Sequence, residues 1–319
     1  MKSLRDGPSD MLLGRCGGSS ILGGKMLIPE KIEGYAHQRF AHGGIMRDRV
    51  VIKWGGGLIT DKSSLCTPNL EVLKQLAETV AECHAEGQEV ILVHGAGSYG
   101  HLRAKNWRLN EGHIPEMPQP EGSICATQRD AVEQVRREML ELNQHVCTAL
   151  ADAGISSIVH PPHLWATNTG MDFQGDLKRF TLRDDHKIHI TFGDVVEVER
   201  EQQFGILSGD DLVVRLALEL PHVKRLVFAV GGVDGLLRVP PEFAAEDDLI
   251  EKWSPDIEFE GVHQSDIDVT GGIGLKAARG AHVAARGIEV LMVNGGIPER
   301  VLAAMLGNPV RGTIVTNKQ

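Results

Sequence analysis

The sequence predicts an α/β protein built on a doubly wound, mainly parallel sheet. Short continuous apolar runs such as 90–93 are typical of strands that are buried on both faces of a parallel sheet. A helical pattern over 67–86 separates the apolar runs 51–52 and 90–93, so strand and helix alternate along the chain. Both runs lead into glycine-rich stretches, at the strand ends where sheets of this kind bind ligands.

The remaining elements continue this alternation. Thr67 is expected to cap the first long helix, with Pro68 at its first position and Gly87 after its end. A second long helix is expected over 123–153, because apolar residues recur there at steps of three and four. Further strands are expected at 155–160, 188–192, 225–230, 288–293 and 312–315, a hairpin at 195–206, and helices at 208–220, 270–286 and 298–306.

Composition excludes several classes of protein. The chain has 319 residues, enough for a large α/β domain, and its net charge of −10 argues against a nucleic-acid-binding protein. No apolar run reaches the length of a membrane span, so no membrane association is expected. The five cysteines form no C-x-x-C pair and the 14 histidines show no ligand spacing, so we expect a cytoplasmic protein with reduced cysteines and no metal site of its own.

Residues 1–47 are expected to form a flexible N-terminal extension. Glycine pairs interrupt the one short apolar patch in this stretch, and no strand or helix period is sustained. Met26 and Met46 are alternative starts of the chain. Residues 48–319 are expected to form the folded domain.

Glycine-rich stretches recur along the chain and indicate an anion site. They lie at 55–57, 95–100, 193–194, 231–235 and 271–274, and the sheet is expected to bring them to one edge. Exposed backbone amides in such loops form anion-binding concavities, and lysines add positive charge. Lys53 and Lys62 flank the stretch 55–57, and Lys276 follows the stretch 271–274. This combination suits phosphoryl transfer, which needs alignment and positive charge on the phosphate oxygens.

Together these stretches resemble the amino acid kinase superfamily and, within it, the isopentenyl phosphate kinases. The resemblance spans about residues 50–315 in the family's order and implies a three-layer αβα sandwich, ATP and Mg²⁺ as cofactors, isopentenyl phosphate as acceptor, and a homodimer. It also implies an acceptor-binding part at about 48–207 and a nucleotide-binding part at about 208–319. The matching pieces are 52–53, 55–56, 58–62, 94–101, 193–196, 206–212, 233–235, 268–272, Lys276 and 311–313.

The resemblance also implies residue roles. His101 matches the histidine that holds the acceptor's phosphate, Lys62 the lysine that stabilises the transferred phosphoryl group, and Lys53 a lysine at the β- and γ-phosphates. The acceptor phosphate is expected beside Ala96, Gly100, His101 and Gly193. The nucleotide is expected to contact Lys53, Gly55, Gly56, Gly57, Gly97, Asp210, Gly272 and Lys276. Asp210 can instead orient Lys53 or Lys62. No general base is needed, because the attacking phosphate oxygen is already anionic.

Three positions depart from the family's pattern. Gly57 stands where a serine is usual, so a hydroxyl contact to phosphate is lost while the backbone amide remains. The pair 231–232 is Gly-Gly where the family has Thr-Asp, which bears on the choice of nucleotide, and Trp54 replaces a smaller apolar residue.

Other polar residues have structural interpretations. Helix capping alone would account for Asp210 and Asp211, a turn for Asp234 and packing for His94. Loop positions are expected for His113, His160 and His163.

Two other functions fit the same motifs. A related kinase of the fosfomycin-resistance type would share the histidine, and a longer or polar acceptor pocket would favour it. Isopentenyl phosphate needs an apolar slot, which we expect from segment 102–145, with Val132, Val135 and Met139 as candidates. A non-catalytic nucleotide sensor is the third interpretation, against which the retained lysines and His101 argue.

Overall fold

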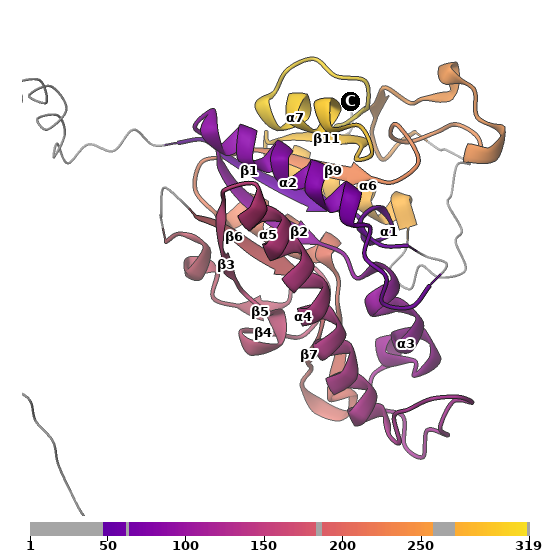
Figure 1. Cartoon of the computed structure of the whole chain (residues 1–319). Coiled ribbons are helices and arrows are strands. Elements are labelled where there is room, and N and C mark those ends of the chain that lie inside the picture. The colour runs from indigo at the N-terminus through magenta and orange to yellow at the C-terminus, as the bar shows by residue number, and fades with distance from the viewer. Residues whose placement is uncertain (1–46, 62–63, 183–186, 258–271, 318–319) are drawn as a thin grey trace, which may run out of the picture. The chain divides into compact units, whose positions relative to one another are not determined.

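The computed structural model describes residues 47–61, 64–182, 187–257 and 272–317, and its centre is an eight-stranded sheet (Figure 1). Most neighbouring strands run parallel, and the pair β11 and β12 is antiparallel. The strands, in spatial order, are β10 (Lys252–Trp253), β12 (Thr313–Val315), β11 (Glu289–Asn294), β9 (Val223–Val230), β1 (Arg49–Trp54), β2 (Glu89–His94), β6 (Lys187–Phe192) and β3 (Ser156–Val159).

Helices cover both faces of this sheet. One face packs α2 (Leu70–Ala85), α4 (Gln128–Asp152) and α7 (Pro298–Leu306), and Figure 1 shows α2 and α4 crossing it side by side. The other face packs α5 (Gly209–Glu219) and α6 (Gly272–Ala284). Each face has its own apolar core, so the expected three-layer αβα sandwich is confirmed.

Shorter elements lie around these layers. A second sheet has the order β5 (Gln174–Gly175), β4 (Ala166–Thr167), β7 (Asp194–Glu197) and β8 (Phe204–Leu207). Its antiparallel pair β7–β8 is the hairpin expected at 195–206. The short helices are α1 (Gly56–Ile59) and α3 (His101–Asn106), and the 3₁₀ turns are Gly97–Tyr99, Leu109–Glu111, Pro162–Leu164, Leu177–Phe180, Arg200–Gln202, Pro241–Phe243 and Glu246–Asp248.

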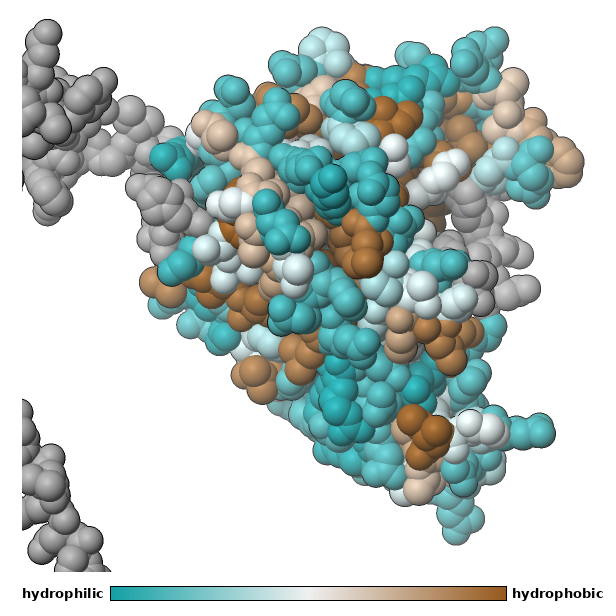
Figure 2. All heavy atoms as spheres, viewed as in Figure 1, coloured by the Kyte–Doolittle hydropathy of each residue, from teal (hydrophilic) through white to brown (hydrophobic). Residues whose placement is uncertain are grey.

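Two helix starts differ from the prediction. Helix α2 begins at Leu70, capped by the side chain of Asn69 and not by Thr67, because Pro68 forms an isolated bridge with Thr60 instead. Helix α4 begins at Gln128 and not at 123, because Thr127 and Asp130 form a capping box there. Outward-facing residues of both helices are mainly hydrophilic, and Figure 2 shows this face as hydrophilic with scattered apolar side chains.

Five parallel strands end side by side, and a glycine follows each. These are β11, β9, β1, β2 and β6, which are consecutive in the sheet, so their carboxyl ends share one edge. The glycines are Gly295, Gly231, Gly55, Gly95 and Gly193. Of the predicted stretch 271–274, Gly272 begins α6, in the helix expected at 270–286, and Gly271 lies outside the described residues.

The loops after β1 and β2 touch through their backbones. A Cβ atom added at Gly56 would lie 2.2 Å from the amide nitrogen of Gly97, and one added at Gly95 would lie 2.6 Å from that of Gly56. Gly97 has a φ of +52°, which favours glycine. The hydroxyl of Thr60 joins the loops, since it donates to the Gly56 carbonyl at 2.8 Å and accepts from the Ser98 amide at 2.9 Å. Glycine is therefore needed here because two main chains meet.

We expect Gly56→Ala to destabilise the protein, because the Gly97 main chain would have to move. Overpacking of this kind costs about 1–3 kcal/mol. Urea unfolding of the wild type and the variant measures the change. Gly296→Ala is the control, since a Cβ there would meet only the Asn294 side chain, at 3.2 Å. Equal stabilities of the two variants would contradict the proposed close contact.

Candidate functional site

A cavity of about 210 Å³ lies at the edge where the five strands end. Its wall comes from the loops after β1, β2, β6 and β9, from the start of α5, and from parts of α3, α4, α6, β7 and β8. The predicted site residues that line it are Lys53, Gly55, Gly56, Gly57, Ala96, Gly97, Gly100, His101, Gly193 and Lys276. Asp210 and Gly272 lie behind the wall, and Lys62 lies outside the described residues.

Two lysines meet at one buried carboxylate. Lys53 on β1 places its Nζ 2.5 Å from Oδ1 of Asp210, and Lys276 on α6 places its Nζ 3.5 Å from Oδ2. Asp210 is 1% exposed. Burial alone would raise its pKa, but the charges of Lys53 and Lys276 outweigh burial and lower it. The carboxylate therefore stays ionised and holds both cations at the cavity wall.

Neither acidic residue at the start of α5 is its cap. Ser208 caps this helix by accepting from the Asp210 amide at 2.9 Å. The Asp211 carboxylate accepts from Nε of Arg279 at 2.8 Å, which ties α5 to α6. Burial raises the pKa of Asp211. The two neighbouring carboxylates thus have separate functions: Asp210 orients lysines of the cavity, and Asp211 joins helices.

Gly272 acts through its carbonyl group. The Nζ of Lys276 donates to this oxygen at 3.1 Å, one helical turn back. The same nitrogen faces Asp210, so two groups fix the Lys276 side chain. Gly272 therefore fixes the side chain of a lysine in the cavity wall, and it does not line the cavity itself.

Backbone amides at the edge divide into occupied and available groups. The amide of Gly55 donates to the Ala229 carbonyl, and that of Gly193 donates to the His94 carbonyl. Within the described part of the chain, the amides of Gly56 and Gly57 donate to no protein acceptor. Both stand at the cavity wall beside Lys53. The loop after β1 therefore offers two donors and a cation to an anion.

The part of the cavity wall formed by α3, α4 and the β7–β8 hairpin is apolar, and we call it the apolar half. Its lining includes Val135 and Met139 of α4, as expected from segment 102–145, whereas Val132 is buried outside the lining. The other apolar members are Leu102, Ala104, Val195 and Ile206. His101, the first residue of α3, adjoins this half. The cavity thus combines a cationic end with a hydrocarbon-lined end.

His94 anchors the loop after β2. Its ring is fully buried and stacks on Phe192 at 4.9 Å between ring centres. Nδ1 lies 3.1 Å from the Gly95 carbonyl oxygen and Nε2 lies 3.3 Å from Oδ1 of Asn143. Burial lowers the pKa of His94 to about 4, so the ring is neutral near pH 7 and donates a hydrogen bond from one of its two nitrogens. His94 therefore packs in the core, as expected, and it also contacts the loop after β2 through the Gly95 carbonyl.

Other polar residues near the site also have partners. Nδ1 of His163 lies 2.6 Å from Oδ2 of Asp194, a residue of the cavity wall. No motif marks this pair in the sequence, because the two residues are distant in the chain. Asp234 lies in the turn after β9, where Asn294, Arg300 and Arg311 contact its carboxylate, consistent with a structural residue.

A second buried histidine shares the low basicity of His94. Nε2 of His160 lies 2.8 Å from Nδ1 of His189, whose Nε2 donates to the Leu182 carbonyl. Burial, followed by the charges of His189 and Arg179, lowers the pKa of His160 to about 4. The expected loop position is confirmed, since His160 follows the end of β3, and its side chain is buried and packs on Phe180.

We expect acid to destabilise the protein between pH 6.5 and 4. In this window His94 binds a proton in the unfolded chain but stays neutral in the folded protein. Its contribution to the free energy of unfolding is therefore complete above pH 6.5 and is lost as the pH falls towards 4. The contribution of His94 is about 3 kcal/mol. Urea unfolding at pH 7 and pH 4 should show a smaller fall for His94→Gln than for the wild type. His113→Gln, at an exposed histidine, is the control and should keep the full fall.

Comparison with known proteins places these features in a family. The model of the amino acid kinase family matches residues 48–294. An isopentenyl phosphate kinase of Methanothermobacter thermautotrophicus is 27% identical over 277 residues, covering 84% of this chain and 99% of that protein. The isopentenyl phosphate kinase of Thermoplasma acidophilum is 29% identical over 253 residues, covering 79% and 94%.

The fold has solved counterparts. A crystal structure of isopentenyl phosphate kinase superposes with a TM-score of 0.70 at 24% identity, covering 84% of this chain and all of that one. The sheet order, the two helical layers and the glycine-lined edge agree with the family match over residues 48–294. This chain belongs to the amino acid kinase family.

Proposed function

We propose that the protein transfers the γ-phosphoryl group of ATP to isopentenyl phosphate, producing isopentenyl diphosphate and ADP. The observation that supports this most strongly is the two-sided cavity, cationic at the glycine loops and apolar between α3, α4 and the β7–β8 hairpin. Its relatives that carry the name isopentenyl phosphate kinase cover nearly the same length of chain.

The cationic end suits the phosphates of the nucleotide. Lys53 and Lys276 face the cavity, and the amides of Gly56 and Gly57 supply two neutral donors. Fixed positive charge on the oxygens of the migrating group is the main stabilising effect in phosphoryl transfer. By its resemblance to the family, Lys62 is proposed to stabilise the transferred phosphoryl group. An acceptor phosphate is already anionic, so no residue has to remove a proton.

His101 is proposed to hold the acceptor phosphate. It stands between Gly100 and Leu102, at the junction of the glycine loops and the apolar half. A histidine can donate a hydrogen bond and can carry charge near neutral pH, as an attacking phosphate dianion requires. Ala96, Gly100 and Gly193 are proposed to border the same phosphate.

Mg²⁺ is proposed to accompany ATP. Among the described residues there is no group of three acidic, histidine or cysteine side chains arranged for a metal. The buried Asp210 faces two lysines, so its oxygens are committed. Phosphate oxygens and water would then hold the ion, as is usual for Mg²⁺ with nucleotides. The ion would neutralise phosphate charge, while the lysines and amides align the groups.

Several finer assignments stay proposals. Residues 48–207 are assigned to the acceptor and 208–319 to the nucleotide, and a cytoplasmic homodimer is proposed from the resemblance. No described helix has the length and apolar character that crossing a bilayer requires.

A kinase of the fosfomycin-resistance type is the second candidate. His101 and the lysines would serve a phosphonate equally well. The apolar half of the cavity, with Val135 and Met139, favours a hydrocarbon tail instead. Incubation with Mg-ATP and either compound, followed by phosphorus NMR, separates them. Diphosphate formation from isopentenyl phosphate is expected, and turnover of fosfomycin alone would overturn the proposal.

We expect His101→Ala to abolish use of the acceptor while ATP still binds. Loss of one donor at a transition state typically costs about 10²- to 10³-fold in rate. A coupled assay for ADP gives kcat/KM for isopentenyl phosphate, and calorimetry gives the affinity for ATP. His113→Ala, at an exposed histidine, is the control and should behave as wild type. A parallel loss of ATP affinity would show that His101 supports the fold of the site.

A further inference from the structure

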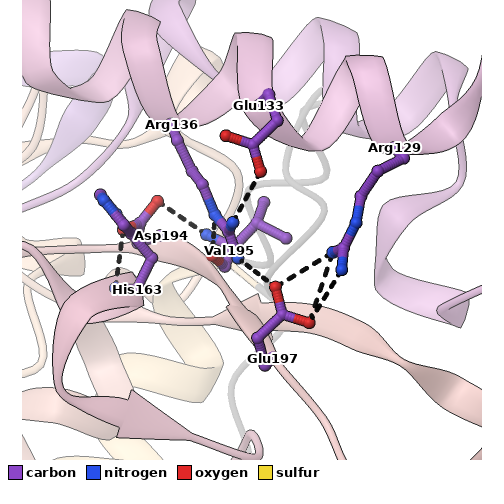
Figure 3. A network of polar contacts seen from close by, with 7 residues as sticks. All are labelled: Arg129, Glu133, Arg136, His163, Asp194, Val195 and Glu197. Carbon is purple, nitrogen blue, oxygen red and sulfur yellow. Dashed lines mark hydrogen bonds and ion pairs between the residues drawn. The ribbon is translucent and has the colours of Figure 1, made fainter.

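Arg136 joins two walls of the cavity (Figure 3). It lies on α4, and its Nε donates to the carbonyl oxygen of Val195 on β7 at 2.9 Å. Its Nη2 lies 3.0 Å from Oε1 of Glu197, two residues further along β7. Its Nη1 lies 2.8 Å from Oε1 of Glu133, one turn back on α4. One guanidinium group thus spans the helix and the strand.

Both of these elements line the apolar half of the cavity. Val135 and Met139 do so from α4, and Val195 does so from β7. Arg136 follows Val135 in the chain, and the group that accepts from Arg136 belongs to Val195 itself. The hydrogen bond of Arg136 therefore acts directly on one wall residue, Val195, and through the main chain on another, Val135. It constrains the distance between α4 and β7.

The contact is shielded from water and charged. The Arg136 side chain is 11% exposed, whereas that of Glu197 is 45% exposed. Burial raises the pKa of Glu197, but the hydrogen bonds and charges of Arg129 and Arg136 lower this pKa by more. The carboxylate therefore stays ionised. Hydrogen bonds from a guanidinium in a fixed fork hold their geometry more firmly than neutral ones.

We propose that Arg136 is a positioning residue that sets the width of the slot for the acceptor's hydrocarbon tail. This inference rests on the proposed function, because it assumes an acceptor with such a tail. Arg136 touches neither phosphate site: its partners lie on β7 and on its own helix. Its removal should therefore change how the enzyme responds to tail length and leave the handling of ATP alone.

Arg129 provides a matched comparison on the same helix. It contacts the same Glu197, at 3.0 Å, but its side chain is 52% exposed and it makes no contact with Val195. A variant at Arg129 removes an equal charge and a contact to the same carboxylate. Only a variant at Arg136 releases the carbonyl of a wall residue.

The test compares Arg136→Met and Arg129→Met across linear alkyl monophosphates of increasing length and isopentenyl phosphate. For Arg136→Met we expect KM for isopentenyl phosphate to rise about tenfold, less than the hundredfold cost of a misplacement of one ångström at the reacting groups. The rise should shrink for the shortest alkyl phosphate, while KM for ATP stays within about twofold. Arg129→Met should match the wild type throughout. Arg136→Lys, which keeps a cation without the fork, should fall between.

Two results would overturn the inference. One is a change in Arg136→Met that is the same for every tail length, and the other is a change that Arg129→Met reproduces. Thermal unfolding checks that each variant folds, and Arg136→Lys carries the test if Arg136→Met does not. Calorimetric binding of the alkyl phosphates provides the same comparison without turnover. A wild type that binds them with tail-dependent affinity but forms no diphosphate would refute the proposed function and leave the role of Arg136 standing.

Discussion

The ion pairs around Asp210 are the constraint on which the site depends. A carboxylate that is 1% exposed is costly to bury unless opposite charge accompanies it, and here Lys53 and Lys276 supply that charge. Because Lys53 comes from β1 and Lys276 from α6, the carboxylate on α5 fixes three elements at once. The lysines in turn are held apart and aimed, which removes much of the entropy that an anion would otherwise have to overcome. The buried charge of Asp210 thus both joins three elements of the fold and orients the two lysines of the cavity.

Much of the fold could be predicted because local signals agreed. Continuous apolar runs marked the strands, and glycines after them marked the edge where ten predicted residues now line a cavity. Positive charge beside the glycine stretches favoured Lys53 and Lys276, and the family resemblance favoured His101. Helix starts were harder, since Thr67 and Asn69 are both good caps and only the pairing of Pro68 with Thr60 decides between them.

Contacts between distant segments could not be predicted. His163 and Asp194 are 31 residues apart, and Arg136 and Val195 are 59 apart. Neither pair belongs to a motif, and charged residues on a helix such as α4 usually face solvent. Val135 and Met139 were visible as part of an apolar stripe, yet the same stripe supplies Val132, which only packs. Which members of a stripe meet a cavity depends on the elements laid across it, here α3 and the β7–β8 hairpin.

The meeting of Gly56 with Gly97 has a consequence for how such an enzyme can diversify. With no side chains between them, the first two loops form a single floor in which neither can shift without the other. Mutations that suit a new acceptor have little room there. They are tolerated in the surrounding walls, where side chains of α3, α4 and β8 can be exchanged one at a time. A floor of closely packed main chain under walls of exchangeable side chains is a geometry from which new substrate ranges can arise by small steps.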